Sequence, residues 1–264
     1  PLGGDNIAKT KQKLNFPFPA FTVPSDVKEF TANYVEKGAD KEENWNKLFA
    51  KYSKKYPADA EEYSRWMNGG TPDLTNEEDL WKFEKDDASR GYSSTVLNKI
   101  TSFIPNIMGG SADLAPSNKS YMKAFGDFTT EYRNGNNMHF GIREHAMSAI
   151  CNGMYLHGGL IPYCATFFVF TDYMKAGMRM SAIMDLPIIY VMTHDSIGVG
   201  EDGPTHEPVE QLAGLRAMPN MNVFRPADGR ETTAAYISAL NAKCPTTIAL
   251  SRQTLPMLEG SSKD

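Results

Sequence analysis

The clearest candidate for acid–base chemistry is Glu144, in the segment HFGIREHAM at positions 139–147. Small and apolar residues follow it, so the sequence predicts that this carboxylate lies in the first turn of a mostly apolar helix. The helix dipole favours a negative charge there, whereas apolar burial favours the protonated acid. A glutamate between these effects could exchange a proton with a ring nitrogen of a ligand. An ion pair with Arg143 or a distant cation is an equally open alternative.

Three aromatic side chains recur at steps of three in the segment ATFFVFTDY, namely Phe167, Phe170 and Tyr173. Spacing of this kind is more typical of core packing. The alternative is a stacking pocket for a flat heteroaromatic ring. Such a pocket would need an acid or a base beside the ring, and Glu144 is the candidate.

The densest group of polar residues lies in the segment THDSIGVGEDGPTHEP at positions 193–208, which contains His194, Asp195, Glu201, Asp202 and His206. Histidines and carboxylates are metal ligands by type, but their spacing matches no compact metal motif such as HExxH. Glycines at positions 198, 200 and 203 would let the backbone approach a ligand, which favours a substrate-binding loop. The plain alternative is that Glu201 and Asp202 are solvated and that His206 caps a helix.

Three further polar residues, Arg90, Ser117 and Arg252, are expected in separate loops. Each alone is most simply a surface or ion-pair residue. Together with His194 they could bind a phosphate, because an arginine presents a fork of donors to phosphate oxygens. The segment around Asp113, GGSADL, is not a P-loop, and the chain has neither a GxGxxG helix start nor a GxSxG elbow.

The elements that must position these residues alternate between strand and helix from about residue 90. Apolar runs such as LPIIYVMT, at 186–193, are typical of parallel strands that are buried on both faces. We therefore expect an α/β domain at 85–264, with a mostly parallel sheet and helices on both faces. Ligands of such sheets bind beyond the carboxyl ends of the strands, where the sequence places Asp113, His194 and Arg252.

The first part of the chain, residues 1–84, has a different composition, rich in Lys, Glu, Asp and Asn. A loose stripe of aromatic and aliphatic residues at helical spacing predicts a helical linker or arm that packs against something else.

Composition narrows the class of protein. The chain has 264 residues and a formal net charge of -5, which favours neither nucleic acid nor anionic membranes as partners. Its apolar runs are shorter than the roughly 20 residues of a membrane span. Three widely spaced cysteines argue against a disulfide framework, so a reducing, cytoplasmic compartment is expected. An imported organellar protein without its targeting segment would look the same.

Several motifs together closely resemble the transketolase family. They occur in family order from about residue 85 to the end: GGSADLAPSN, HFGIREHAM, ATFFVFTDY, THDSIGVGEDGPTHEPVEQLAGLR, FRPADG and LSRQTLP. The long stretch from His194 to Arg216 is the most specific. The N-terminal arm resembles the family more loosely, through PLG and RGYSSTVLNKI.

The resemblance implies an enzyme that uses thiamine diphosphate, bound between two domains from different subunits of a dimer. This chain matches the domain for the pyrimidine ring. Glu144 would hydrogen-bond N1′ of the ring and favour the imino tautomer that deprotonates thiazolium C2. Phe167, Phe170 and Tyr173 would form the ring pocket, and Asp113 would lie beside the cofactor.

The substrates implied are sugar phosphates of the pentose phosphate pathway, between which a two-carbon ketol unit passes from a ketose to an aldose. The resemblance assigns the grip on the phosphate to four residues: Arg90, Ser117, His194 and Arg252. Asp202 and His206 would lie near the substrate hydroxyls. Glu144 and His206 are then the catalytic candidates.

One departure from the family is that this sequence has no GDG…N motif, which ligates a Mg or Ca ion in the diphosphate-binding domain. We expect a middle fragment without metal ligands, inactive alone, that needs a homodimer partner or a diphosphate-binding domain. The alternatives are a dihydroxyacetone synthase-like enzyme, which the phosphate-binding residues argue against, and a split subunit completed by a separate chain. A metal hydrolase built on His194 and His206 is a distant third.

Overall fold

The computed structural model describes residues 2–263. These residues form two compact units, one that ends at Glu62 and one that begins at Tyr63. Among the described residues, no helix has the length and apolar character needed to cross a bilayer.

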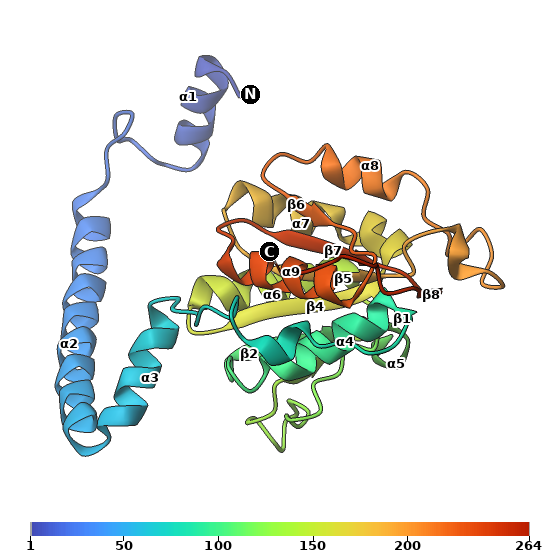
Figure 1. The fold of residues 1–264 in the computed structure, drawn as a ribbon. Coiled ribbons are helices and arrows are strands. Elements are labelled where there is room, and N and C mark those ends of the chain that lie inside the picture. The colour runs from blue at the N-terminus through green and yellow to red at the C-terminus, as the bar shows by residue number, and fades with distance from the viewer. Residues whose placement is uncertain (1, 264) are drawn as a thin grey trace. The chain divides into compact units, whose positions relative to one another are not determined.

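The first unit consists of helices joined by loops. Figure 1 shows helix α1 (Gly4–Lys13) and the long helix α2 (Ser25–Lys55) in blue. Neither helix buries any of its side chains. Aromatic residues on α2 contact one another instead, as in the edge-to-face pair of Phe30 and Tyr34 at 5.1 Å. Helix α3 (Pro57–Met67) continues into the second unit.

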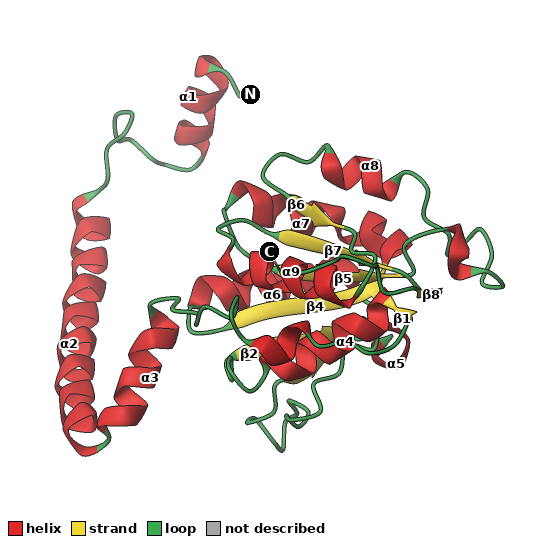
Figure 2. Ribbon diagram, in the orientation of Figure 1, coloured by secondary structure: helices red, strands yellow, loops and turns green. Residues whose placement is uncertain are grey.

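The second unit is built on a six-stranded sheet in which every neighbouring pair is parallel (Figure 2). Its strand order is β3-β2-β4-β5-β7-β6. The strands are β2 (Ile107–Ser111), β3 (Asn137–His139), β4 (Ile161–Phe167), β5 (Ile189–Thr193), β6 (Asn222–Phe224) and β7 (Thr246–Leu250). A short antiparallel pair, β1 (Asp87–Ala88) with β8 (Thr254–Leu255), joins the two ends of this domain.

Helices cover both faces of the sheet, because alternate residues of its buried strands point to opposite sides. On one face, α4 (Ser89–Ile100) and α9 (Gly229–Asn241) pack with Tyr163 of β4. On the other face, α6 (Glu144–His157) and α7 (Thr171–Ile183) pack with Cys164. The short elements are α5 (Ala115–Asn118), α8 (Gln211–Arg216), η1 (Glu78–Trp81), η2 (Phe168–Phe170) and η3 (Ile197–Val199). The predicted parallel α/β fold is confirmed.

The order of the strands locates a crevice at the carboxyl edge of the sheet. From β2 the chain continues to β3 on one side, whereas from β4 it continues to β5 on the other side. Loops that leave two neighbouring strands in opposite directions open a crevice beyond their carboxyl ends. The crevice is expected beyond Ser111 and Phe167, the last residues of β2 and β4.

Candidate active site

Glu144 is the first residue of α6 and is buried, with 8% of its surface exposed. Its Oε1 accepts a hydrogen bond from Thr166 Oγ1 at 3.3 Å. Arg143 does not pair with it, since the Arg143 guanidinium donates to the Phe140 carbonyl at 2.8 Å. Within residues 2–263, Glu144 takes part in no ion pair. The carboxylate therefore keeps acceptor positions that a ligand could use.

The aromatic triplet begins where β4 ends and extends outward. Phe167 and Phe170 stack with ring centroids 5.9 Å apart and an interplanar angle of 12°. Phe170 lies 5.9 Å from Tyr173, which is 67% exposed on α7. An exposed end of this kind is unlike a core cluster. It fits the alternative in which these rings meet a ligand or a partner surface.

His194 follows β5 directly and is buried against the aromatic triplet. Its ring centroid lies 3.7 Å from that of Phe167, and its backbone is in the left-handed region with φ 61°. Burial, and after it the nearby Arg90 charge, lower the pKa of His194 from 6.5 to about 4. The imidazole is therefore neutral at pH 7.

His206 approaches the same rings edge-on. Its centroid is 5.4 Å from Phe170 and 5.9 Å from Phe167, both at 69°. It lies in a turn closed by a hydrogen bond from its amide to the Gly203 carbonyl, at 3.0 Å. The N-cap of the next helix, α8, is Glu210, so His206 does not cap it. The aromatic and histidine side chains predicted from separate segments thus form one cluster.

A positively charged group adjoins this cluster. Arg90 Nη1 donates to the Ser117 carbonyl at 2.7 Å and lies 3.4 Å from His194 Nε2. Burial, and then the nearby Arg252 charge, lower the pKa of Arg90. Its buried Nε has no hydrogen-bond partner among the described residues. Two neighbouring guanidinium groups and a buried unpaired donor suit a phosphate.

The sequence could not specify the contacts of three further residues near this positively charged group, Ser117, Arg252 and Asp202. Ser117 contributes its backbone carbonyl to Arg90, rather than its hydroxyl. Arg252 Nη2 pairs with the exposed Glu201 at 3.1 Å. Asp202 is exposed, and its charge acts on both Arg90 and His194.

Asp113 lies at the carboxyl ends of β2 and β3, in the left-handed region with φ 62°. It lines a hollow of about 370 Å³ together with Ser111, Ser120, Tyr121 and His139. The structure thus places Asp113 at the predicted edge of the sheet, in a hollow whose lining includes none of the aromatic triplet.

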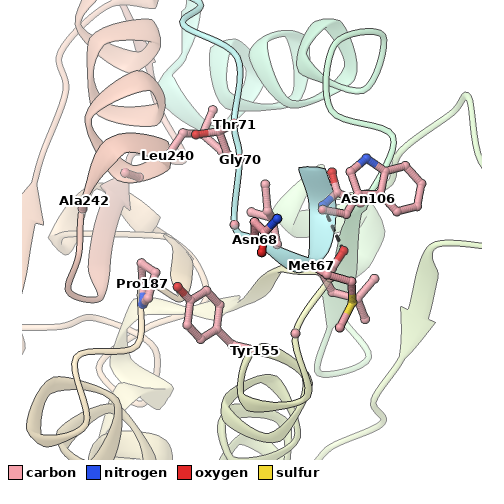
Figure 3. A pocket seen from close by; sticks show the side chains of 16 residues that line it. Met67, Asn68, Gly70, Thr71, Asn106, Tyr155, Pro187, Leu240 and Ala242 are labelled. Carbon is pink, nitrogen blue, oxygen red and sulfur yellow. Dashed lines mark hydrogen bonds between the residues drawn. The ribbon is translucent and has the colours of Figure 1, made fainter. Parts of the chain in front are cut away.

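A second hollow, of about 330 Å³, lies at the opposite, amino edge of the sheet (Figure 3). Asn106, Tyr155 and Pro187 are among its lining residues (Figure 3). The lining contains no Asp, Glu, Lys, Arg or His, so this hollow is unsuited to a phosphate or to acid–base chemistry. Among residues 2–263, no three His, Cys, Asp or Glu side chains gather where they could hold a metal ion.

Sequence reasoning missed the polar residues that support the site. Thr166 holds Glu144, while Ser111, Asn118 and Thr193 form a buried hydrogen-bonded chain that ends at His194. Three of these four lie at or next to the carboxyl end of an apolar strand, where a polar residue is unexpected unless it is bonded. A polar residue at the carboxyl end of an apolar strand was therefore the sequence feature that could have indicated these supporting residues.

The parallel sheet, the helices on both of its faces and the polar edge at its topological switch point define a ligand-binding α/β domain of the doubly wound class. Residues 87–257 match the family model "Transketolase, pyrimidine binding domain". Residues 1–72 match "Transketolase, thiamine diphosphate binding domain". The chain belongs to the transketolase family.

Individual relatives agree with the family models. A chloroplastic transketolase of Craterostigma plantagineum is 50% identical over 99% of this chain and 51% of its own length. The solved transketolase of Leishmania mexicana superposes with a TM-score of 0.92, at 41% identity over 100% of this chain and 40% of its own. A transketolase of Pichia stipitis in complex with sedoheptulose-7-phosphate gives 0.90, at 42% identity, with coverage of 100% and 40%. The chain spans about half, or less, of the length of the curated relatives that it matches.

Proposed function

We propose that this chain supplies the pyrimidine-binding side of a thiamine diphosphate-dependent transketolase, which transfers a two-carbon ketol unit from a ketose phosphate to an aldose phosphate. The observation that carries the proposal is Glu144, a buried carboxylate without an ion pair among the described residues, at the start of α6, where it accepts a hydrogen bond from Thr166, the residue before Phe167. A carboxylate in such a place needs a partner.

The residues present fit the aminopyrimidine of thiamine diphosphate. Phe167, Phe170 and Tyr173 offer aromatic faces for the ring, and Glu144 would hold or move a proton at the ring nitrogen N1′. When bound, the cofactor would supply a nucleophilic thiazolium carbon for chemistry at the substrate carbonyl. Asp113, at the carboxyl end of β2, would lie beside it.

The substrate would bind with its phosphate at the positively charged Arg90 and Arg252, next to the neutral ring of His194, with Ser117 fixing Arg90. Asp202 and His206 would meet the sugar hydroxyls, and His206 would take part in proton transfer. The phosphate site favours phosphorylated acceptors over the non-phosphorylated acceptor of a dihydroxyacetone synthase-like enzyme. The Pichia stipitis relative, which was solved with a sugar phosphate, supports this choice.

The rest of the active site would come from outside the pyrimidine-binding domain. We propose that this domain occupies residues 85–264, in line with the family model that begins at residue 87. A Mg or Ca ion would be held by a complete diphosphate-binding domain, of which residues 1–72 match a part. The exposed aromatic residues of α2 suit packing against that domain or a homodimer partner. The chain alone would then be inactive.

For its location we propose a reducing compartment such as the cytoplasm. Cys151, Cys164 and Cys244 are all free, and the first two are buried. Several relatives are chloroplastic, and the same chemistry would operate in an organelle.

Ketol transfer tests the proposal. The chain is assayed alone and then with a separately produced diphosphate-binding domain, thiamine diphosphate and Mg²⁺, using phosphorylated and free acceptors. We expect activity only in the completed mixture and mainly with phosphorylated acceptors. Glu144→Gln should abolish most of it, while the exposed Glu259→Gln is the control. Robust transfer by the chain alone, or equal use of formaldehyde as a non-phosphorylated acceptor, would contradict the proposal.

A further inference from the structure

Two buried serines bind each other directly before the two arginines of the positively charged group. Ser89 precedes Arg90 at the start of α4, and Ser251 precedes Arg252 just after β7, 162 residues further along the chain. The Ser89 amide donates to Ser251 Oγ at 2.9 Å, and the Ser251 amide donates to Ser89 Oγ at 2.6 Å. Each serine is at most 2% exposed. We call this reciprocal pair the serine clasp.

The hydroxyl hydrogens of the serine clasp have one consistent arrangement. Ser251 Oγ lies 2.9 Å from the Gln253 carbonyl, which can only accept, and 3.1 Å from Ser89 Oγ. Among these contacts, each hydroxyl hydrogen finds an acceptor only when Ser251 donates to Gln253 and Ser89 donates to Ser251. Ser251 Oγ then accepts from both the amide and the hydroxyl of Ser89. Removing the Ser89 hydroxyl would therefore leave the buried amide of Ser251 without an acceptor.

The serine clasp matters more to Arg252 than to Arg90. Arg90 belongs to α4, and its guanidinium is bound to the Ser117 carbonyl at 2.7 Å. Arg252 lies in the short segment between β7 and β8, and its guanidinium pairs with Glu201, whose side chain is 81% exposed. An ion pair at such an exposed carboxylate restrains a side chain only weakly. The place of Arg252 therefore depends mainly on how its backbone is held.

Beside the serine clasp, the backbone bonds between these two segments are few. The Arg90 amide donates to the Ser251 carbonyl at 3.4 Å, which is long, and β1 pairs with β8 over two residues only. The two arginines also repel each other, since after burial the Arg252 charge lowers the pKa of Arg90. In addition, Arg90 lies in the first turn of α4, where the helix dipole disfavours a positive charge. Two such cations stay together without a bound anion only if the backbone restrains them.

We propose that Ser89, through Ser251, is a positioning residue that holds Arg252 beside Arg90, so that both guanidinium groups can bind one anion. The inference rests on the proposed function for the nature of that anion, a sugar phosphate. The restraint on Arg252 does not depend on that function, because it consists of contacts within this chain.

The first measurement is the binding of inorganic phosphate to the intact chain, followed at pH 7 by NMR titration of ¹⁵N-labelled protein. We expect Ser89→Ala to weaken binding about tenfold, because a hydrogen bond to a charged group is commonly worth that much. Ser89→Thr keeps the hydroxyl and should bind phosphate as the wild type does. In an Arg252→Met background, Ser89→Ala should weaken binding no further, since the serine acts through that arginine.

The second measurement is the pKa of His194 in a buffer without phosphate. Burial is the main cause of its low value; among the charged neighbours, Arg90, Arg252 and His206 lower the pKa and Asp202 raises it. Ser89→Ala lets Arg252 move away, so it should raise the pKa of His194, and it should have no such effect in the Arg252→Met background. The chain has five histidines, and His194→Gln identifies the relevant NMR signals.

Ser93→Ala is the matched control. Ser93 lies one turn further along α4, is 2% exposed, and its Oγ lies 2.8 Å from the Tyr236 hydroxyl. The variant removes a buried serine hydroxyl from the same helix, but on the side that packs against α9. It should change neither phosphate binding nor the pKa of His194, even if it destabilises the domain as much as Ser89→Ala does.

Three results would overturn the proposal. They are phosphate binding and a His194 pKa in Ser89→Ala that equal those of the wild type, the same changes in Ser93→Ala, or an equal effect of Ser89→Ala in the Arg252→Met background. If Ser89→Ala does not fold, Ser89→Cys replaces it, because a thiol of similar size accepts hydrogen bonds only weakly; equal behaviour of Ser89→Cys and Ser89→Thr would then contradict the proposal.

The two measurements separate this inference from the proposed function. If the wild type binds no phosphate, the proposed phosphate site fails, and the pKa of His194 alone decides the role of Ser89. If the wild type binds phosphate and Ser89→Ala binds it equally well with an unchanged His194 pKa, the phosphate site stands and the role of Ser89 is refuted.

Discussion

The low pKa of His194 makes the stability of this domain fall in mild acid. In the unfolded chain an imidazole binds a proton near pH 6.5, whereas burial and Arg90 hold the pKa of His194 at about 4 in the folded domain. Between these values the unfolded chain binds more protons. The free energy of unfolding therefore decreases as the pH falls from 6.5 toward 4.

The size of the effect follows from the same two values. Each pH unit between 6.5 and about 4 is worth about 1.4 kcal/mol, so His194 lowers the free energy of unfolding by about 2 kcal/mol at pH 5 and about 3 kcal/mol at pH 4. This is a large part of the roughly 5–15 kcal/mol that stabilises an ordinary domain. Above pH 7 the contribution vanishes.

Replacing His194 by glutamine removes this titration, so the free energy of unfolding should fall less steeply as the pH decreases from 7 to 4.5. Urea unfolding between pH 4.5 and 7.5, followed by tryptophan fluorescence, gives the free energy of unfolding for both proteins. We expect the difference between wild type and His194→Gln to change by about 2 kcal/mol from pH 7 to pH 5. His157 is exposed at the end of α6, so His157→Gln should leave the pH dependence of the free energy of unfolding as in the wild type. Parallel pH profiles for wild type and His194→Gln would refute the reasoning.

Two further predictions concern the charged group and the end of the domain. Arg90→Met should raise the pKa of His194, though not fully to 6.5, because burial is the larger cause of the low value. The same change should weaken the binding of inorganic phosphate. NMR titration checks both effects, and an unchanged pKa of His194 would count against the contact with Arg90. Asp228→Ala should destabilise the domain by about 1–3 kcal/mol in urea unfolding, since this buried side chain caps α9 at the Glu231 amide and also accepts from Ser261 Oγ and the Leu258 amide. Glu259→Ala, on an exposed turn, is its control, and equal losses in the two would show that the cap contributes little.

Much of the fold follows from local patterns in the sequence. The continuous apolar run that became β5 has no polar alternation, and it was predicted as a strand buried on both faces. The pair of β1 and β8 was not predicted, because two-residue strands are too short to show a period.

The sequence predicts where the candidate site lies in the fold, but it does not predict most of the side-chain contacts within the site. The rule that ligands bind at the carboxyl ends of parallel strands placed Asp113, His194 and Arg252 at one edge of the sheet. The link from Asn118 to Thr193 could not be predicted, since it depends on strands β2 and β5 lying either side of β4. The roles of Glu144 and the aromatic triplet came from the family resemblance, because spacing alone left their chemistry open.

The central claim is that Glu144 is the proton partner of the cofactor's pyrimidine ring. The most direct measurement is the rate of deuterium exchange at thiazolium C2 of thiamine diphosphate bound to the completed enzyme, followed by quenched-flow NMR. We predict that Glu144→Gln slows this exchange by about 10²–10⁴-fold, the usual range for losing a positioned acid–base group, while Glu259→Gln leaves it unchanged. Exchange in Glu144→Gln at the wild-type rate, with cofactor fully bound, would contradict the claim.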